Sequence, residues 1–397
     1  MQKKLQFLKV RGSDIVDECG RRVTLHGAAL GGWLMMEGYM MCGRNIPEKT
    51  LKANIAKSLG GSAEKDFTDS FRRTFITESD IKAIKSWGAN LIRIPFNYKV
   101  IDKPGIRHLD NVIGWCRKNS IYCILDMHAA PGAQNEDWHS DCIGQPQLFT
   151  RKANQDRYLR LWKFLARRYK NESAIAGYDI LNEPVVPFAR ERIVKELFEK
   201  ATAVIRAEGD NHIIFQEGNF WGQRIKCLGK PKDPNTAFSV HIYAPSDYVF
   251  NWDLDHKYPC EVGGVMWNKK RLEAIVKEYS RISKKVGAPI FVGEFGVSWR
   301  GGHSGELDWT KDIASLFKKY GFHWTYWTYK TIANSHSPDG IYRYTKNPPW
   351  INRKGPVTGW ENFYTLWKKE RGGIIESWRT RNFVLNEKLL GVLKKYM

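Results

Sequence analysis

The sequence of 397 residues lacks several features, and each absence narrows the class of protein. No apolar run approaches the roughly 20 residues that a transmembrane helix needs, and the start, "MQKKLQFLKV", has no apolar core of a signal peptide. The seven cysteines are odd in number and show no CxxC spacing, so neither a disulfide framework nor a zinc knuckle is indicated. We expect free thiols and a cytoplasmic protein as the sequence stands, or a secreted one if a leader has been removed.

Acidic residues are scarce beside basic ones. There are 63 Lys and Arg against 42 Asp and Glu, which gives a net charge of +21. Such a balance attracts nucleic acids and acidic polymers over long range. The basic residues are nevertheless scattered through helical patterns such as "RKANQDRYLRLWKFLARRYK", and they form no long tract or known nucleic-acid motif. We interpret them as a solvated outer face and expect no nucleic-acid partner.

The chain also lacks a linker, an internal repeat and a low-complexity segment, so we expect a single domain over residues 1–397. Apolar or β-branched runs alternate with helical patterns, which is typical of βαβ units around a parallel sheet. No GxGxxG turn follows the first run, and this favours a single (β/α)8 TIM barrel over a doubly wound sheet. The predicted strands are residues 22–30, 90–96, 121–129, 174–183, 212–218, 238–243, 290–296 and 323–329.

Two segments predict covering helices. Residues 77–88, "TESDIKAIKSWG", open with a capping signal at Thr77. Residues 192–205 place one apolar face on the helix, formed by Ile193, Leu197, Phe198, Ala201 and Ile205.

Three long connections, residues 131–153, 244–267 and 331–360, all follow ends of predicted strands. In a barrel they would be extended loops around the mouth at the C-terminal face. Because the second is rich in aromatic residues, we hypothesise that it is a lid or a wall of the binding site. The alternative is a surface excursion packed on the barrel.

Polar residues recur where predicted strands end, and such positions carry the chemistry of barrels. In "GYDILNEP", residues 177–184, an apolar run meets an ionisable carboxylate, and Pro184 cannot continue a sheet ladder. Glu183 is therefore predicted to lie where the core opens into a loop. A lone His or Glu of this kind is more often structural than catalytic, but the whole set would converge on one mouth. The set is Arg93, His128, Asn182, Glu183, His241, Tyr243, Glu294 and Trp327.

Glu183 and Glu294 form the pair with the clearest chemistry. Two carboxyl groups roughly 5 to 5.5 Å apart perform retaining glycoside hydrolysis, whereas roughly 6.5 to 9.5 Å admits water for inversion. The sequence does not determine which of these two separations applies to Glu183 and Glu294. A cation such as Arg93 would keep one carboxylate ionised. The negative charge of that carboxylate would then push the other carboxyl toward its protonated form.

The motifs "RIPFNY", "DMHAAPGAQN", "LNEP", "HIY", "FVGEFG" and "WTYWTYK" occur in this order along most of the chain. The ordered set resembles family five of the glycoside hydrolases. The resemblance implies that Glu183 is the general acid/base and Glu294 the nucleophile, with His241 near the acid/base. Arg93 and Tyr243 would position and tune the nucleophile. Asn182 would bind the sugar 2-hydroxyl, His128 would contact the sugar, and Trp327 would be its stacking floor.

A second layer of similarity points to a subgroup. "LGGWLMMEGYM" resembles the "GGW…E" segment of the exo-β-1,3-glucanase branch, which implies that Glu37 holds the terminal sugar. "APGAQN" is also similar to that branch and points to Asn135. Trp138 and His139 in "NEDWHSD" depart from the fungal pattern, so the linkage preference stays open. Glu37 could equally be a loop residue that caps a helix.

Aromatic side chains pack on the C–H faces of sugars, and the chain holds 16 Trp. Those at or just beyond strand ends, Trp138, Trp221, Trp252 and Trp299, are candidates for outer subsites.

The sequence therefore predicts a retaining hydrolase of β-linked glucans or glucosides, similar to exo-β-1,3-glucanases and β-glucosidases, that needs no cofactor or metal. Its partner would be a β-linked oligo- or polysaccharide, and its oligomeric state stays open. One alternative is an endo-acting β-glucanase (cellulase-like) or β-mannanase. Another is a non-catalytic carbohydrate-binding barrel, which has no need of paired carboxylates such as Glu183 and Glu294.

Overall fold

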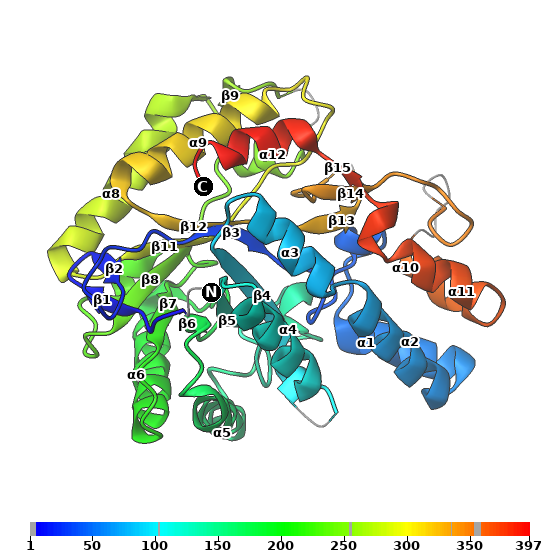
Figure 1. Ribbon diagram of the computed structural model, residues 1–397, viewed down its shortest axis with the longest axis horizontal. Helices are drawn as coiled ribbons and strands as arrows, with labels where there is room; N and C mark the ends of the chain where they lie inside the picture. Colours follow the sequence, from blue (N-terminus) through cyan, green and yellow to red (C-terminus); the bar gives the residue numbers. More distant parts are fainter. Residues whose placement is uncertain (1–4, 102–103, 254–255, 335, 353–358) are drawn as a thin grey trace.

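The computed structural model describes residues 5–101, 104–253, 256–334, 336–352 and 359–397. Within these ranges, eight parallel strands close a barrel in chain order, with the last strand hydrogen-bonded to the first (Figure 1). The predicted (β/α)8 class is confirmed. The barrel strands are β3 (His26–Ala29), β4 (Leu91–Asn97), β5 (Tyr122–Ala129), β6 (Ile175–Asp179), β7 (Ile213–Glu217), β8 (Thr236–His241), β11 (Ile290–Phe295) and β12 (His323–Tyr326).

Several strands end earlier than the sequence predicts. Strand β6 ends at Asp179 instead of Glu183, and Tyr243 and Trp327 lie just beyond β8 and β12. Glu183 has φ of 46°, in the left-handed region that no strand residue adopts. The backbone therefore turns out of the sheet before it reaches the predicted end.

Helices form an outer ring around the barrel (Figure 1). They are α3 (Glu78–Ser86), α4 (Ile106–Lys118), α5 (Lys152–Tyr169), α6 (Arg192–Ala207), α8 (Lys269–Val286) and α9 (Glu306–Tyr320). Helix α3 begins with the predicted cap, a capping box between Thr77 and Asp80. Helix α6 buries the predicted apolar face, although Ile193 at its start is only partly buried. Strands β7 and β8 are joined through a 3-10 turn, η5 (Ile225–Leu228).

The barrel interior is layered along the strand direction. The layer near the strand starts is apolar, and a hairpin of β1 (Lys9–Arg11) and β2 (Asp14–Val16) closes it from below with Leu8 and Ile15. Side chains two positions further along a strand face the same interior, because the side-chain period of a strand is two. There the layer is polar: Leu91 is followed by Arg93, Ile124 by Asp126, Phe215 by Glu217 and Ala237 by Ser239. The sequence analysis did not predict the hairpin.

A second group of elements lies beside the barrel, to the right in Figure 1. It packs around Trp378, whose ring centroid lies 5.5 Å from Phe67 and 5.2 Å from Phe71. We propose that this group and the barrel fold as one unit, because the same buried apolar cluster runs through both. The group consists of α1 (Glu48–Leu59), α2 (Gly61–Thr74), α10 (Trp360–Thr365), α11 (Trp367–Ser377), β13 (Lys330–Ile332), β14 (Tyr342–Tyr344) and β15 (Val384–Leu385).

The three long connections leave the C-terminal ends of β5, β8 and β12, as predicted. The first contains η3 (Trp138–Ser140), and the second contains α7 (Ser246–Val249) with a hairpin of β9 (Cys260–Val262) and β10 (Val265–Trp267). The third contains β13 and β14, and residues 353–358 of it lie outside the described residues. The remaining elements are η1 (Tyr39–Met41), η2 (Tyr98–Ile101), η4 (Phe188–Arg190), η6 (Thr380–Asn382) and α12 (Glu387–Lys394).

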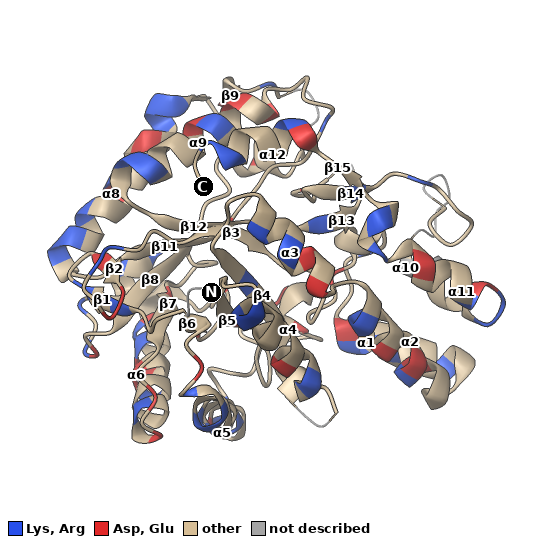
Figure 2. Ribbon diagram, viewed as in Figure 1, with Lys and Arg blue, Asp and Glu red and all other residues tan. Residues whose placement is uncertain are grey.

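The charge and the cysteines agree with the sequence interpretation. Lys and Arg are spread over the outer helices, notably α5, α6, α8 and α9 (Figure 2), as expected of a solvated face. No disulfide joins cysteines in the described part of the chain. Among the described residues, no helix combines the length and apolar character that crossing a membrane requires.

Candidate active site

Arg93 is the centre of the polar layer and is fully buried. Its Nη1 donates to Oε1 of Glu294 at 2.7 Å, and its Nη2 donates to Oδ1 of Asn182 at 2.9 Å. Burial alone would lower the pKa of the guanidinium, but the surrounding carboxylates raise it well above its ordinary value. Arg93 is therefore a fixed cation inside the barrel. Its further carboxylate partners are Asp126 at 3.1 Å, Asp179 at 3.2 Å and Glu217 at 3.3 Å.

Glu294 receives a hydrogen bond on each carboxylate oxygen. Arg93 binds one oxygen, and the hydroxyl of Tyr243 donates to the other at 2.8 Å. A shift in strand register between Val292 and Glu294 directs the side chain, since such irregularities re-aim residues near active sites. Gly293 makes this possible, because a Cβ atom there would lie 2.8 Å from Oγ of Ser239. The result is a carboxylate held in one orientation by two hydrogen-bond donors.

The backbone of Glu183 is held from both sides. Its N–H donates to Oε2 of Glu217 at 2.7 Å, and its carbonyl accepts a hydrogen bond from Nδ2 of Asn135 at 2.9 Å. These bonds fix the left-handed conformation that aims the side chain at the barrel axis. Glu217 was missed in the sequence analysis, although it ends strand β7 in "FQEG", the same signal that identified the other residues.

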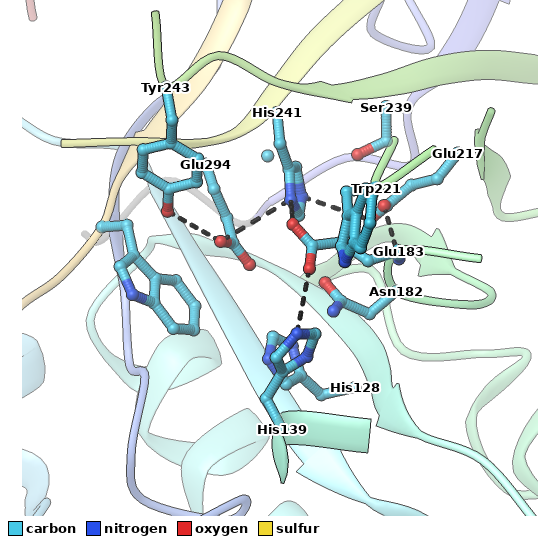
Figure 3. A network of polar contacts seen from close by, with 12 residues as sticks. His128, His139, Asn182, Glu183, Glu217, Trp221, Ser239, His241, Tyr243 and Glu294 are labelled. Carbon is cyan, nitrogen blue, oxygen red and sulfur yellow. Dashed lines mark hydrogen bonds and ion pairs between the residues drawn. The ribbon is translucent and has the colours of Figure 1, made fainter. Parts of the chain in front are cut away.

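Two histidines contact the carboxylate of Glu183 (Figure 3). Nδ1 of His241 lies 2.6 Å from Oε1, and Nε2 of His139 lies 3.3 Å from Oε2. Burial works to raise the pKa of Glu183, but the hydrogen bond from His241 and the charges of both histidines outweigh it and lower the pKa. This corrects the expectation that one carboxylate, kept ionised by Arg93, pushes the other carboxyl toward its protonated form by its negative charge. The sequence could not show that two imidazoles meet this side chain.

The protons at this side of the site are held by His241 and His139, and not by Glu183. Burial would lower the pKa of His241, but Glu217, Glu294 and Glu183 raise it well above its usual range. Burial opposes protonation of His139 as well, yet its bond to Asp137 and the charge of Glu183 raise its pKa to about 9. At neutral pH both rings are cationic.

The separation of the two candidate carboxylates matches one of the two hydrolytic geometries. One oxygen of Glu183, one nitrogen of His241 and one oxygen of Glu294 all lie within 4.8 Å of one another. Retaining enzymes hold their carboxyl groups roughly 5 to 5.5 Å apart, and inverting ones roughly 6.5 to 9.5 Å. The arrangement is therefore suited to direct attack by a carboxylate.

The same three side chains are of types that ligate metals, which their sequence spacing did not suggest. Arg93 donates to Glu294, and His241 is itself cationic. A divalent ion between them would meet two positive charges at short range. The arrangement favours carboxylate chemistry over metal binding.

His128 and Trp327 lie together at the mouth, and His128 also packs against His139 with ring centroids 5.6 Å apart. The rings of His128 and Trp327 stack with centroids 5.4 Å apart and planes inclined by 8°. Nδ1 of His128 lies 2.7 Å from Oδ2 of Asp126, and Nε1 of Trp327 donates to the hydroxyl of Tyr39 at 2.6 Å. Tyr39 and Asp126 were given no role from the sequence, and they lock the two rings that are predicted to contact the sugar.

Glu37 also lies near His128. Its Oε1 lies 3.9 Å from Nε2 of His128 and has no hydrogen-bond partner among the described residues, although Glu37 is 3% exposed. Burial raises the pKa of Glu37 to about 8 against the opposing charge of His139. The following helix η1 has Gly38 as its N-cap and no side-chain cap, so Glu37 does not serve as a helix cap. Nδ2 of Asn182 is a second buried polar atom without a partner.

Asn135, predicted to bind the sugar, also makes hydrogen bonds within the protein. Its Nδ2 donates to the carbonyl of Glu183, and its Oδ1 accepts from the N–H of Asp137 at 2.9 Å. Both polar ends of the amide are thus used inside the protein. Asn135 positions Glu183.

The four tryptophans predicted for outer subsites do not lie together. Trp221 donates from Nε1 to Oδ2 of Asp137 at 2.7 Å, and Trp138 lies edge-on to His139 with centroids 5.8 Å apart. Trp252 is 64% exposed and stacks on Phe250. Trp299 lines a separate hollow near β15.

Comparisons with known proteins agree with this geometry. The family model for cellulase, glycosyl hydrolase family 5, matches residues 55–332. A β-xylosidase of Phanerodontia chrysosporium is 33% identical over 87% of this chain and 75% of its own. Endoglucanase C of Acetivibrio thermocellus is 27% identical over 71% of this chain and 92% of its own. A glucan 1,3-β-glucosidase of Yarrowia lipolytica is 26% identical over 60% of this chain and 62% of its own.

Solved structures show the same fold. Endoglucanase Cel5A of Thermotoga maritima superposes with a TM-score of 0.62 at 20% identity, covering 93% of this chain and 96% of that one. An endogalactoceramidase gives a TM-score of 0.58 at 18% identity over 83% of this chain and 76% of its own. The family match and the paired glutamates lead to one conclusion: this chain belongs to glycosyl hydrolase family 5 and is a glycoside hydrolase that acts on β-glycosides.

Proposed function

We propose that the protein is a retaining, exo-acting β-glycosidase that removes terminal glucosyl units from β-linked glucans or glucosides. The observation that carries this proposal is the separation of at most 4.8 Å between carboxylate oxygens of Glu183 and Glu294. Two carboxylate oxygens this close support the shorter separation of retaining enzymes over the wider one that admits a water for inversion.

In the first step, an oxygen of Glu294 forms a bond to the anomeric carbon while the bond from that carbon to the leaving oxygen breaks. The leaving oxygen takes a proton from Glu183, which is supplied by His241 at 2.6 Å. Arg93 and Tyr243 hold Glu294 in the attacking orientation through hydrogen bonds of 2.7 and 2.8 Å.

In the second step, Glu183 accepts a proton from water as the water oxygen bonds to the anomeric carbon, and this proton returns to His241. The bond from that carbon to Glu294 breaks, and Arg93 and Tyr243 stabilise the carboxylate that re-forms. Two displacements at the same carbon restore the β configuration.

The surroundings of the pair support exo action. Glu183 and Glu294 are 9% and 4% exposed, and Glu37 and Asn182 present unpartnered polar atoms nearby. Buried polar atoms of this kind are suited to the hydroxyls of one enclosed sugar, since an unpaired buried group is costly. The glucan 1,3-β-glucosidase relative supports the same assignment.

The glycone has a second candidate. The β-xylosidase relative is 33% identical to this chain, and its name favours a terminal xylose. The endoglucanase relatives are less similar, at 27% identity, and support internal cleavage.

A hydrolysis screen tests the proposal. Aryl β-glucoside, β-xyloside and β-mannoside are compared, and the anomer first released is followed by proton NMR. We expect the β-glucoside to be the best substrate and the β-anomer to appear first. On a soluble β-glucan, only short terminal products should accumulate. Early release of the α-anomer would exclude retention, and a ladder of long products would exclude exo action.

A further inference from the structure

A hollow of about 580 Å³ adjoins the acid/base side of the site. It lies between the connections that follow β5, β6 and β7, and its lining begins with Val185, two residues after Glu183. Asn135 and Asp137 also line it. Asn135 holds the carbonyl of Glu183, and Asp137 lies 3.4 Å from His139, which contacts the carboxylate of Glu183. These contacts place the hollow beside Glu183, the residue that we propose protonates the leaving group.

Most of the lining is apolar. Aromatic rings and aliphatic side chains contribute the walls, among them Phe149, Val185, Val186, Phe188, Phe220 and Trp221. Phe188 and Phe220 are 61% and 41% exposed, with ring centroids 6.0 Å apart. Exposed rings that lie next to each other at the edge of a hollow mark a surface for an apolar ligand.

Several polar groups of the walls are already bound within the protein. Nε1 of Trp221 donates to Asp137, and each end of the Asn135 amide makes one hydrogen bond. The backbone of Val186 is bound in both directions by the side chain of Asn219, each at 2.9 Å. The polar part of the lining is completed by the side chains of Glu136, Gln145, Thr150 and Arg190, so it is the aromatic and aliphatic walls that favour an apolar ligand.

We propose that this hollow is an aglycone site for an apolar leaving group, such as the alkyl chain of a β-glycoside amphiphile. The inference rests on the proposed function, because it needs Glu183 to protonate the leaving oxygen at the edge of the hollow. Each methylene that the walls remove from water would increase kcat/KM by up to about fourfold.

A series of alkyl β-glucosides tests this inference: methyl, butyl, hexyl and octyl, all below their micelle concentrations. The leaving alcohols beyond methanol have similar acidity, so the requirement for protonation is nearly constant across the series. We expect kcat/KM to rise steeply with chain length, and octyl glucoside to exceed laminaribiose and cellobiose. A flat series, or a disaccharide that is hydrolysed faster than octyl glucoside, would overturn the proposal in favour of a sugar subsite.

The variant Phe188→Glu places a charge at the edge of the hollow on an exposed side chain. We expect the octyl to methyl ratio of kcat/KM to fall about tenfold, because the chain must then pack beside a carboxylate. Val384→Glu is the matched control, since Val384 is 57% exposed and lies in β15, outside the hollow. It should keep the parent ratio, and an equal fall in both variants would overturn the assignment.

Binding without turnover gives a second measurement. Octyl and methyl β-thioglucosides resist hydrolysis, and the octyl compound should inhibit aryl glucoside hydrolysis at much lower concentration. Equal inhibition by the two compounds would contradict an apolar site. If the parent hydrolyses no β-glycoside at all, the proposed function itself fails. If it hydrolyses aryl and methyl glucosides without any effect of chain length, the aglycone inference alone fails.

Discussion

Nδ1 of His241 lies 2.6 Å from Oε1 of Glu183, and the two groups share one proton that favours the imidazole. A general acid must release its proton to the leaving oxygen, yet here the carboxylate has a lowered pKa. In the proposed mechanism, the proton is therefore stored on His241 and passes through Glu183 to the leaving oxygen. When Glu294 becomes an ester, its negative charge near His241 is lost, which lowers the affinity of the ring for the proton.

Glu294→Gln should reduce kcat at least about 10⁴-fold, because the amide cannot attack the anomeric carbon. The carbonyl oxygen of the new side chain can still accept from Arg93. Initial rates on an aryl β-glucoside and a thermal unfolding scan measure the two effects. Glu278→Gln, on the exposed surface of α8, is the control and should keep the parent rate. Near-normal hydrolysis by Glu294→Gln would exclude the mechanism.

Glu183→Ala should still form the glycosyl intermediate from a substrate with a good leaving group, since little acid assistance is needed. Breakdown of the intermediate would lack its base. Added azide needs no deprotonation, and it should restore turnover and give a β-glycosyl azide, identified by NMR. In Glu294→Ala, azide entering from the opposite face should give the α product. An α product from Glu183→Ala would reverse the two roles.

His139→Gln should move the alkaline limb of the pH profile of kcat/KM to higher pH. The charge of His139 lowers the pKa of both Glu183 and Glu37, so its removal raises both. An unchanged limb would mean that His139 has no electrostatic part in the site.

His139→Gln should also change how the free energy of unfolding depends on pH. The pKa of His139 is about 9 in the folded protein and about 6.5 in an unfolded chain, so its contribution is complete below pH 6.5. That contribution, at most roughly 3 kcal/mol, is lost as the pH rises through 9. Urea unfolding of parent and variant should therefore differ most at pH 6 and least at pH 10. A constant difference across this range would contradict the raised pKa.

Trp252→Ala should lower kcat/KM for longer oligosaccharides by about three- to tenfold and leave a short aryl glucoside nearly unaffected. The Trp252 ring stacks on Phe250 at 5.0 Å, and Phe250 lies 4.9 Å from Tyr243, so it extends the aromatic surface away from the nucleophile. Met266→Ala, an exposed site in the same connection, is the control. Equal losses on both substrates would place Trp252 at the central sugar.

Trp378→Ala should destabilise the protein by roughly 3 to 5 kcal/mol while keeping a single unfolding transition. Trp378 is 1% exposed and joins α2 to α11 through its ring contacts. Calorimetry of parent and variant checks both expectations. Two separate transitions in the parent would show that the elements beside the barrel fold independently.

Most of the barrel could be predicted because its strands are covered on both faces and are therefore long apolar runs. The hairpin of β1 and β2 and the strands β13 to β15 have two or three residues each, too few to show a period. Turns that depend on tertiary contacts could not be predicted from the sequence either. The end of β6 is one example, since the turn at Glu183 depends on hydrogen bonds to Asn135 and Glu217.

The site was predictable where polar residues interrupt a strand end, as at Arg93 and Glu294. Glu217 had the same signal and was overlooked. Asp179 was left without a role because alternation near a strand end is ambiguous, and the structure turns it toward Arg93. His139 and Tyr39 lie in 3-10 helices of three residues each, too short to show a period. The lowered pKa of Glu183 follows from distances between separate strands, which no local pattern encodes.

The layering of the barrel interior separates two kinds of mutational effect along a single strand. At Leu91, a smaller side chain would leave a cavity in a sealed apolar layer, and the change would be measured as lost stability. Two residues later, at Arg93, a substitution would disturb the charges around Glu294 and lower turnover, in addition to the stability lost when the buried carboxylates lose their cation. A directed-evolution library confined to the upper layer could therefore alter the chemistry while the lower layer keeps the scaffold folded.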